Sequence, residues 1–351
     1  MTQVAGDHEP TTGTRELKVG LNPYGLTYTV GLQGFGTPRA NPAGSGLEGF
    51  LGIAERLGAE VVEIFSPWLT ELGPDGRRAL GERLRGAGVV PIASASLYGE
   101  PVGDLVQNAI DVGAPTMRLG LSPILQGDRS AYGAARFAER IAAIRADLSV
   151  LGPAAAAAGI TIGIENHQDF GSAELMDFAE QAGENVGITF DTGNAFPVGE
   201  APLDFARTVA PRVRHVHLKD YRVQFTDEGY RLVRCAIGDG AVPFREILEL
   251  LTADGRSLTA VLEPGALEAR HIRLFTPDWW RGYAPKDARA LAAALHAARV
   301  NPLPESEDFR TPWERGAPGD ELLAYERDMV ERSAANMRAL GVMKEHAWTS
   351  R

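Results

Sequence analysis

The chain has 351 residues, of which 44% are hydrophobic and 23% are charged, as is usual for a globular protein with a sizeable core. Its net charge of −11 argues against a nucleic-acid partner or an anionic membrane surface, because basic patches bind phosphate groups. Cys235 is the only cysteine, which excludes an intrachain disulfide and a thiolate metal cage. A cytoplasmic protein is expected, because Met1 to Gly13 lack the apolar core of a secretory signal and no apolar run is long enough to span a bilayer.

After a flexible start over residues 1–15, short apolar runs alternate with longer amphipathic or Ala-rich stretches. Strands are expected at Leu17–Leu21, Ala59–Phe65, Val89–Ala95, Thr116–Leu121, Ile160–Glu165, Val186–Asp191, Val213–Leu218 and Leu258–Glu263. Helices are expected between them at Leu47–Leu57, Arg77–Gly86, Gly103–Val112, Ala134–Ala158, Ala173–Ala182, Leu203–Val209 and Phe244–Leu251. Apolar runs without clean alternation are typical of parallel strands buried on both faces.

Eight such alternations predict a single (β/α)8 TIM barrel over residues 16–265. A doubly wound open sheet is the alternative, but no GxGxxG motif follows the first strand. Three segments exceed a minimal barrel: a long Gly- and Pro-rich loop at Asn22–Gly46 after the first strand, a β-hairpin at Tyr221–Arg234 after the seventh, and residues 266–351. The last segment is expected to form a helical extension packed on the barrel, with helices near Lys286–Arg299 and Asp320–Leu340.

Four of the expected strands end in a side chain that can bind a metal ion: Glu165, Asp191, His217 and Glu263. The spacing is 26 residues from Glu165 to Asp191 and again 26 from Asp191 to His217, which is about one strand–helix unit. The 46 residues from His217 to Glu263 correspond to one unit plus the hairpin. Because the C-terminal strand ends of a barrel surround one pocket, these four side chains are expected to converge there.

Three carboxylates and one imidazole form a mostly oxygen site that suits Mn²⁺ or Mg²⁺, with Co²⁺ and Zn²⁺ as alternatives. An ion chelated by adjacent hydroxyl and carbonyl oxygens polarises the carbonyl and neutralises an enediolate, while a nearby base removes the α-proton. One acidic residue at a strand end often caps a helix or forms a salt bridge. Four at matched spacing are much harder to explain in that way.

Five further residues are candidates for the same pocket. His167 lies two residues beyond Glu165 and could act as a general base or only hydrogen-bond a ligand carboxylate. His215 shares strand parity with His217 and is expected to support the ligands rather than bind the ion. Asn194 and Lys219 could contact substrate oxygens or be structural, and Glu63 could reach the pocket, orient a ligand or be a polar core residue.

These motifs resemble the sugar phosphate isomerase/epimerase branch of the xylose-isomerase-like TIM barrels. The matching pieces are Ile-Glu-Asn-His at 164–167, Phe-Asp-Thr-Gly-Asn at 190–194, His-Val-His-Leu-Lys-Asp at 215–220, Gly-Asp-Gly at 238–240 and Leu-Glu-Pro-Gly at 262–265. The resemblance covers roughly Leu17 to Gly265 and implies a metal ion bound by Glu165, Asp191, His217 and Glu263, with chemistry through an enediolate. Members of that branch isomerise, epimerise or dehydrate sugars, or cleave 3-oxo-glycosides.

Two features separate this chain within the branch. Ketose 3-epimerases place a histidine three residues after the aspartate that Asp191 matches, and here that position is Asn194. Such epimerases also pair two glutamates as acid and base across the sugar; Glu165 and Glu263 remain. In addition, the loop at 36–42, the Glu-Asn-His at 165–167 and a tail with Arg273, Trp279, Trp280 and Tyr283 are similar to the alpha subunit of bacterial C-glycoside deglycosidases.

This narrower resemblance implies a metal-dependent carbon–carbon lyase that acts on a 3-oxo-C-glycoside made by a separate oxidoreductase. His167 would remove the C2 proton, and the enediolate would expel the aromatic aglycone by β-elimination. The family also has a small beta subunit, which implies a hetero-oligomer. The aromatic cluster from Trp279 to Tyr283 would suit a flat aglycone or that partner, or would pack the last helices on the barrel.

Three other functions are open to such a chain. The first is an isomerase, epimerase or dehydratase of a keto-sugar or keto-inositol. The second is an endonuclease on abasic DNA, which would need about three metal ions, a basic groove and further histidines, although the first four expected strands contain no histidine. The third is a barrel that binds a sugar without turnover.

Overall fold

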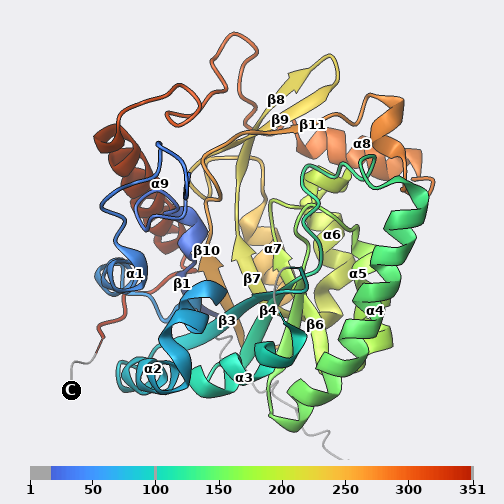
Figure 1. Ribbon diagram of the computed structural model, residues 1–351. Coiled ribbons are helices and arrows are strands. Elements are labelled where there is room, and N and C mark those ends of the chain that lie inside the picture. The colour runs from blue at the N-terminus through green and yellow to red at the C-terminus, as the bar shows by residue number, and fades with distance from the viewer. Residues whose placement is uncertain (1–16, 99–100, 349–351) are drawn as a thin grey trace, which may run out of the picture.

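The computed structural model of the protein describes residues 17–98 and 101–348. Eight parallel strands close into a barrel in the order β1-β10-β7-β6-β5-β4-β3-β2, which confirms the predicted (β/α)8 fold (Figure 1). These strands are β1 (Leu17–Leu21), β2 (Val61–Ile64), β3 (Val90–Ser96), β4 (Thr116–Gly120), β5 (Thr161–Glu165), β6 (Val186–Asp191), β7 (Val213–Leu218) and β10 (Leu258–Leu262). The expected flexible start, residues 1–15, lies outside the described residues.

Seven helices follow the strands and cover the outside of the barrel (Figure 1). They are α1 (Gly46–Arg56), α2 (Ser66–Gly86), α3 (Val102–Val112), α4 (Gly133–Ala157), α5 (Ser172–Ala182), α6 (Pro202–Val209) and α7 (Phe244–Leu251). The second begins well before the expected Arg77, because it is two helical pieces joined at a kink. Gly73, with φ 62° and ψ 176°, and Pro74 interrupt its hydrophobic periodicity and hide its first part from the sequence.

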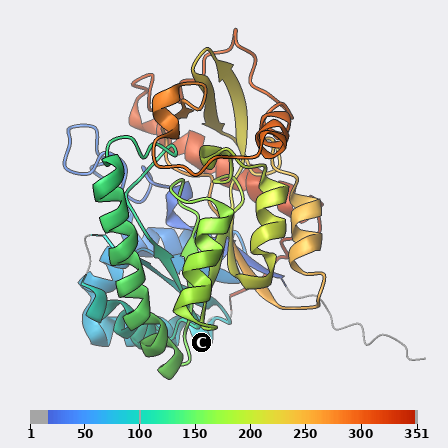
Figure 2. The same ribbon diagram turned by 90° about the vertical axis from the view of Figure 1, so that its right-hand side faces the viewer.

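Two more helices lie beyond the last barrel strand. The terminal helix α9 (Gly319–Ala339) packs against β10 and the short turn Pro23–Gly25, so it covers the side of the barrel at its closing strands (Figure 1). Helix α8 (Ala288–Ala297) instead lies at the other side, near the hairpin (Figures 1 and 2). No helix in residues 17–98 and 101–348 is long and apolar enough to cross a membrane.

The hairpin predicted after β7 is present as β8 (Tyr221–Thr226) and β9 (Gly229–Arg234). A third antiparallel strand, β11 (Arg270–Ile272), pairs with β9 and was not predicted, because three residues are too short to show alternation. Figure 2 shows this small sheet standing above one end of the barrel. Since β8 starts three residues after the C-terminal end of β7, the sheet lies at the end where the candidate ligands gather.

Candidate metal centre

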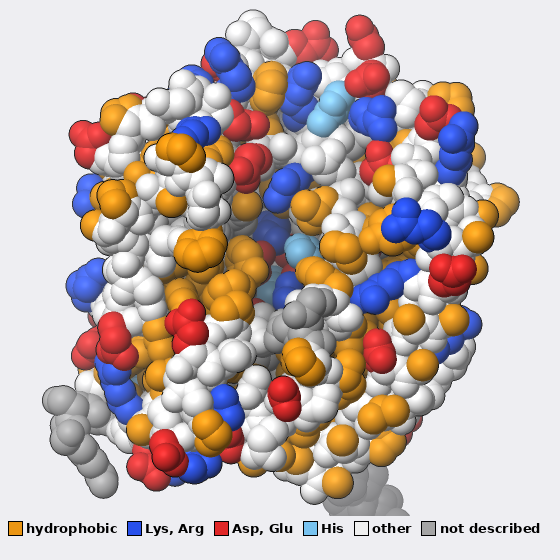
Figure 3. All heavy atoms as spheres, in the orientation of Figure 1, with side chains coloured by type: hydrophobic (Ala, Val, Ile, Leu, Met, Phe, Trp, Pro, Cys, Tyr) orange, Lys and Arg blue, Asp and Glu red, His pale blue; other side chains and the backbone are white. Residues whose placement is uncertain are grey.

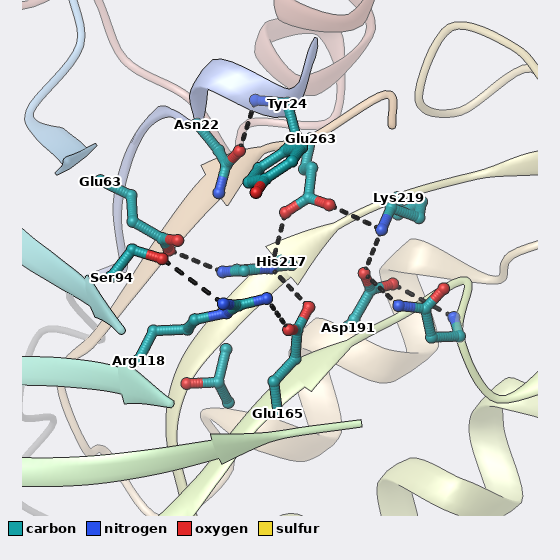
Figure 4. A network of polar contacts seen from close by, with 12 residues as sticks. Asn22, Tyr24, Glu63, Ser94, Arg118, Glu165, Asp191, His217, Lys219 and Glu263 are labelled. Atoms are coloured by element: carbon teal, nitrogen blue, oxygen red, sulfur yellow. Dashed lines mark hydrogen bonds and ion pairs between the residues drawn. The ribbon is translucent and has the colours of Figure 1, made fainter. Parts of the chain in front are cut away.

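The four expected ligands lie at the C-terminal ends of neighbouring strands. Glu165 and Asp191 are the last residues of β5 and β6, His217 is next to last in β7, and Glu263 directly follows β10. Asp191 pairs with His217 in the register of the sheet, and His217 pairs with Val261. Matched register therefore points the side chains into one space: one ligand atom from each of the four lies within 4.8 Å of the others, and all four are buried (Figure 4).

The geometry of this cluster fits a divalent ion. His217 Nδ1 lies 3.1 Å from Oε1 of Glu165 and 2.7 Å from Oε2 of Glu263. Two ligands at right angles around an ion, each about 2.1 Å from it, are about 3.0 Å apart. Three carboxylates and one imidazole are also a donor set for Mn²⁺, Mg²⁺ or Co²⁺, so the residues present suit the ion that the sequence predicts.

Glu63 and His215 lie on the opposite side of the His217 ring. Glu63 Oε2 is 2.7 Å from Nε2 of His217 and 3.4 Å from Nε2 of His215, whose Nδ1 lies 2.7 Å from Oγ1 of Thr259. Burial alone would raise the pKa of Glu63, but the charge of His217, its hydrogen bond to Glu63 and the nearby His215 imidazole hold that pKa below its usual range. Glu63 therefore orients His217 so that Nδ1 faces the other candidate ligands.

Asp191 is held by a dense set of hydrogen bonds. Its Oδ1 accepts from the backbone N–H groups of Gly193 and Asn194, and its Oδ2 accepts from Nδ2 of Asn194 at 2.8 Å and from Nζ of Lys219 at 2.5 Å. The side chain of Asn166 bonds both the N–H and the C=O of Asp191, which ties β5 to β6. In this arrangement Asn194 and Lys219 contact the carboxylate of a candidate ligand.

His167 stands beside the cluster without belonging to it. It is partly buried, and its Nδ1 is buried with no hydrogen-bond partner in the described chain. Burial lowers the pKa of His167 to about 4, so the imidazole is neutral at neutral pH. A neutral imidazole with a free nitrogen is able to accept a proton.

The loop that carries His167 is fixed by two residues in the left-handed conformation. Gln168 has φ 66° and Gln126 has φ 61°, values that favour glycine. The N–H of Gln126 donates to Oε1 of Gln168 at 3.0 Å, and the N–H of Gly127 donates to the C=O of Gln168 at 2.9 Å. The loop after β4 therefore holds the loop after β5 in a strained shape next to the cluster.

Arg118, in the middle of β4, was missed by the sequence reasoning. Its Nη2 forms an ion pair with Oε2 of Glu165, and its Nη1 lies 3.4 Å from Oγ of Ser94 (Figure 4). Burial would raise the pKa of Glu165, but the positive charge of Arg118 holds it well below its usual range. The signal was present in the sequence, because an arginine inside the apolar run Thr116–Leu121 is unusual for a buried strand.

The aromatic cluster of the C-terminal segment packs internally. Trp279 has no exposed surface and stacks on Tyr283 with ring centroids 4.7 Å apart. The indole N–H groups of Trp279 and Trp280 donate to backbone carbonyls at 2.9 and 2.7 Å, as does the hydroxyl of Tyr283 at 2.8 Å. Trp279 therefore has a packing role, which was one of the two roles that the sequence left open for this cluster. Its ring is not free to stack on a ligand.

The face seen in Figure 3 is hollowed at its centre, where basic, acidic and histidine side chains gather inside a rim of hydrophobic and uncharged groups. In the same orientation, Figure 1 shows the barrel strands β4, β7 and β10 at the middle of the view. A small polar molecule would meet charged groups at the bottom of this hollow.

Comparisons with known proteins agree with this architecture. The model of a family described as the xylose isomerase-like TIM barrel matches residues 51–274. YihM, an uncharacterized protein of Escherichia coli K12, is 33% identical over 98 residues, which are 28% of this chain and 30% of that protein. An inosose dehydratase of Klebsiella pneumoniae is 33% identical over 132 residues, covering 33% of this chain and 44% of the dehydratase. The matched stretches span less than half the length of these curated relatives.

Several solved structures share the fold at low sequence identity. D-psicose 3-epimerase with D-tagatose from Clostridium cellulolyticum H10 is 15% identical with a TM-score of 0.57, covering 93% of this chain and 100% of that chain. The IolI protein with a binding zinc atom is 15% identical with a TM-score of 0.50, covering 80% and 95%. These likenesses concern the fold alone. The family model matches well over half of this chain, and the chain therefore belongs to the xylose isomerase-like TIM barrel family.

Proposed function

We propose that this protein is a divalent-metal-dependent lyase that removes an α-proton from a keto-sugar-like substrate and then eliminates a β-substituent. The proposal is carried by one observation: four ligand atoms lie within 4.8 Å of one another, beside a neutral imidazole with a free nitrogen. Glu165, Asp191, His217 and Glu263 would hold the ion, with Mn²⁺ favoured and Mg²⁺ or Co²⁺ as alternatives. When bound, the ion would polarise the ketone and stabilise negative charge on its oxygen.

The residues of the chain then divide the work. Glu63 and His215 orient the His217 imidazole, and Asn194 holds the carboxylate of Asp191 in place. His167 takes the α-proton onto its free nitrogen, and the electron pair of the broken C–H bond enters the enediolate. In the second step this pair forms a C=C bond, and the β-substituent leaves with its own bonding pair and takes up a proton.

A 3-oxo-C-glycoside is the substrate class that we propose, which makes the β-substituent an aromatic aglycone. The proposal is supported by the sequence likeness of the loop at 36–42, the Glu-Asn-His at 165–167 and Arg273 to C-glycoside deglycosidase alpha subunits. It includes a small beta subunit as partner. Trp279 no longer supports an aglycone platform, because the ring is fully buried.

A dehydratase of a keto-inositol is the second candidate, and the partial match to inosose dehydratases at 33% identity favours it. The two candidates share proton abstraction and differ only in the group that leaves, an aglycone carbon or water. A keto-sugar isomerase or epimerase is a third outcome, in which the α-proton exchanges but nothing is eliminated.

One panel of assays separates these outcomes. The purified protein, with Mn²⁺ and with any small subunit that co-purifies, is incubated with an oxidised C-glycoside, a keto-inositol and a free keto-sugar in deuterated water. Release of free aglycone supports the C-glycoside proposal, and loss of water from the keto-inositol supports the dehydratase. If all substrates remain unchanged while the ion is bound at full occupancy, the proposed function is wrong.

A further inference from the structure

Glu165 and Glu263 are held in the same way, each between the His217 imidazole and a buried cation. Oε1 of Glu165 lies 3.1 Å from Nδ1 of His217, and Oε2 of Glu165 pairs with Arg118. Oε2 of Glu263 lies 2.7 Å from the same Nδ1, and Oε1 of Glu263 lies 2.7 Å from Nζ of Lys219 (Figure 4). Each glutamate therefore directs one oxygen toward the candidate ion and gives the other to a cation.

Both cations are fixed rather than mobile. Arg118 projects from a barrel strand, its side chain is 9% exposed, and its Nη1 lies 3.4 Å from both Oγ of Ser94 and the C=O of Ala95. The Lys219 side chain is 4% exposed, and its stem passes so close to Gly193 that a Cβ there would lie 3.0 Å from Cγ of Lys219. Buried ion pairs of this kind are screened little by water and are costly to break.

We propose that Arg118 and Lys219 keep Glu165 and Glu263 as one-oxygen ligands and withdraw both glutamates from proton transfer. This inference rests on the proposed function and narrows it. Epimerisation with two bases needs an acid–base group on each side of the substrate carbon. With both glutamates engaged by cations, His167 would remove the proton from one side, and neither glutamate would return it from the other.

The fate of the carbanion follows from this asymmetry. The α-carbon–hydrogen bond breaks, its proton goes to the His167 imidazole, and its electron pair is delocalised into the enediolate. Without a donor on the opposite side, the pair either takes a proton back from the His167 imidazole on the same side, after exchange with solvent, or forms a C=C bond as the β-substituent departs with its bonding electrons. The departing group takes up a proton, so the products are an unsaturated ketone and the protonated leaving group. The site is thus built for elimination rather than epimerisation.

The first test concerns coordination and needs no substrate. A crystal structure of the Mn²⁺-loaded protein is expected to show one oxygen of Glu165 and one of Glu263 on the ion, with Arg118 and Lys219 on the other two oxygens. Chelation of the ion by both oxygens of either glutamate would overturn the proposal. This experiment needs no turnover, so it tests the role of Arg118 and Lys219 even if the proposed activity is not found.

The second test uses stereochemistry in deuterated water. The wild-type protein is expected to introduce deuterium at the α-carbon with retention and to form epimer only as a trace product. An epimer as a main product would overturn the proposed role of Arg118 and Lys219 without contradicting metal-dependent keto-sugar chemistry. Arg118→Met is expected to raise the ratio of epimer to elimination product by about tenfold or more, and Arg118→Lys to restore the wild-type ratio. An unchanged ratio in folded, metal-loaded Arg118→Met would also contradict the proposal. Arg83→Met, at an exposed arginine paired with Glu48, is the matched control, and Lys219→Met replaces the first variant if it fails to fold.

Discussion

The Nε2 atom of His217 lies 2.7 Å from a carboxylate oxygen of Glu63, and both side chains are buried. The negative charge of Glu63 fixes a proton on Nε2, which leaves the lone pair of Nδ1 for an ion. Glu63→Gln removes that charge with little change in volume, so the affinity for Mn²⁺ is expected to fall about 10- to 100-fold. Calorimetric titration with Mn²⁺ measures it, with the exposed Glu55→Gln as control. Equal affinity for Mn²⁺ in Glu63→Gln and wild type would show that Glu63 does not orient His217 for metal binding.

His167→Asn is expected to separate binding from chemistry. The buried Nδ1 of His167 has no partner among the described residues, so its loss breaks no hydrogen bond there. The substitution is expected to lower kcat about 10²- to 10⁴-fold while the affinity for Mn²⁺ stays within twofold of wild type, because a general base contributes about that much to the rate. Steady-state kinetics and metal titration on one preparation test this, and a variant that keeps its kcat argues against His167 as the base.

Asp169 makes stability depend on pH. It is fully buried, accepts a hydrogen bond from Ser122 at 2.8 Å, and has its pKa raised by burial from 3.8 to about 7. Between these values the folded protein holds a proton that the unfolded chain has released. The contribution of Asp169 to stability therefore falls as pH rises from about 4 to 7 and stays low above 7.

Asp169→Asn cannot ionise; its Oδ1 can still accept from the N–H of Phe170, and its amide nitrogen can donate to the Ser122 hydroxyl. The variant is therefore expected to be more stable than wild type at pH 8 by up to roughly 4 kcal/mol and about equal near pH 4. Denaturant unfolding at several pH values measures the difference, with Asp227→Asn in an exposed turn as control. A variant that is less stable than wild type at pH 8 would contradict a raised pKa of Asp169 in the folded protein.

Glu326 connects the terminal helix to the long loop after β1. Its carboxylate accepts from the N–H groups of Tyr28 and Thr29 at 2.9 and 2.8 Å and from the hydroxyls of Thr27 and Thr29. Glu326→Gln places an amide donor against these donors, which is expected to lower the free energy of unfolding by about 1–3 kcal/mol. The exposed Glu331→Gln on the same helix is expected to have almost no effect. Comparable stability of the two variants would argue against this connection.

The sequence was sufficient for the barrel and for the convergence of its candidate ligands, because both follow from short-range regularities. Buried parallel strands are short apolar runs, and one strand–helix unit has a nearly constant length, so the positions of Glu165, Asp191 and His217 could be placed at the same height. The kinked start of α2 was hidden by Gly73 and Pro74, and β11 was too short to show a period.

The partners of the ligands could not be derived in the same way, since they depend on which side chains meet across the barrel. Arg118 and Glu263 lie far apart in the sequence, yet both belong to the polar network around His217 (Figure 4). Lys219, a candidate for substrate contact in the sequence, pairs with Asp191 and Glu263. Such contacts are decided by side-chain direction at the barrel mouth, which spacing along the chain does not encode.

The most direct test of the central claim is the number of Mn²⁺ ions bound by wild type and by Asp191→Asn, measured by calorimetry and by elemental analysis of the dialysed protein. We expect one ion per chain in wild type and no measurable binding in Asp191→Asn, whose fold is checked by circular dichroism. If the wild-type protein binds no divalent ion, or if the variant binds it as tightly as wild type, the four candidate ligands are not a metal site.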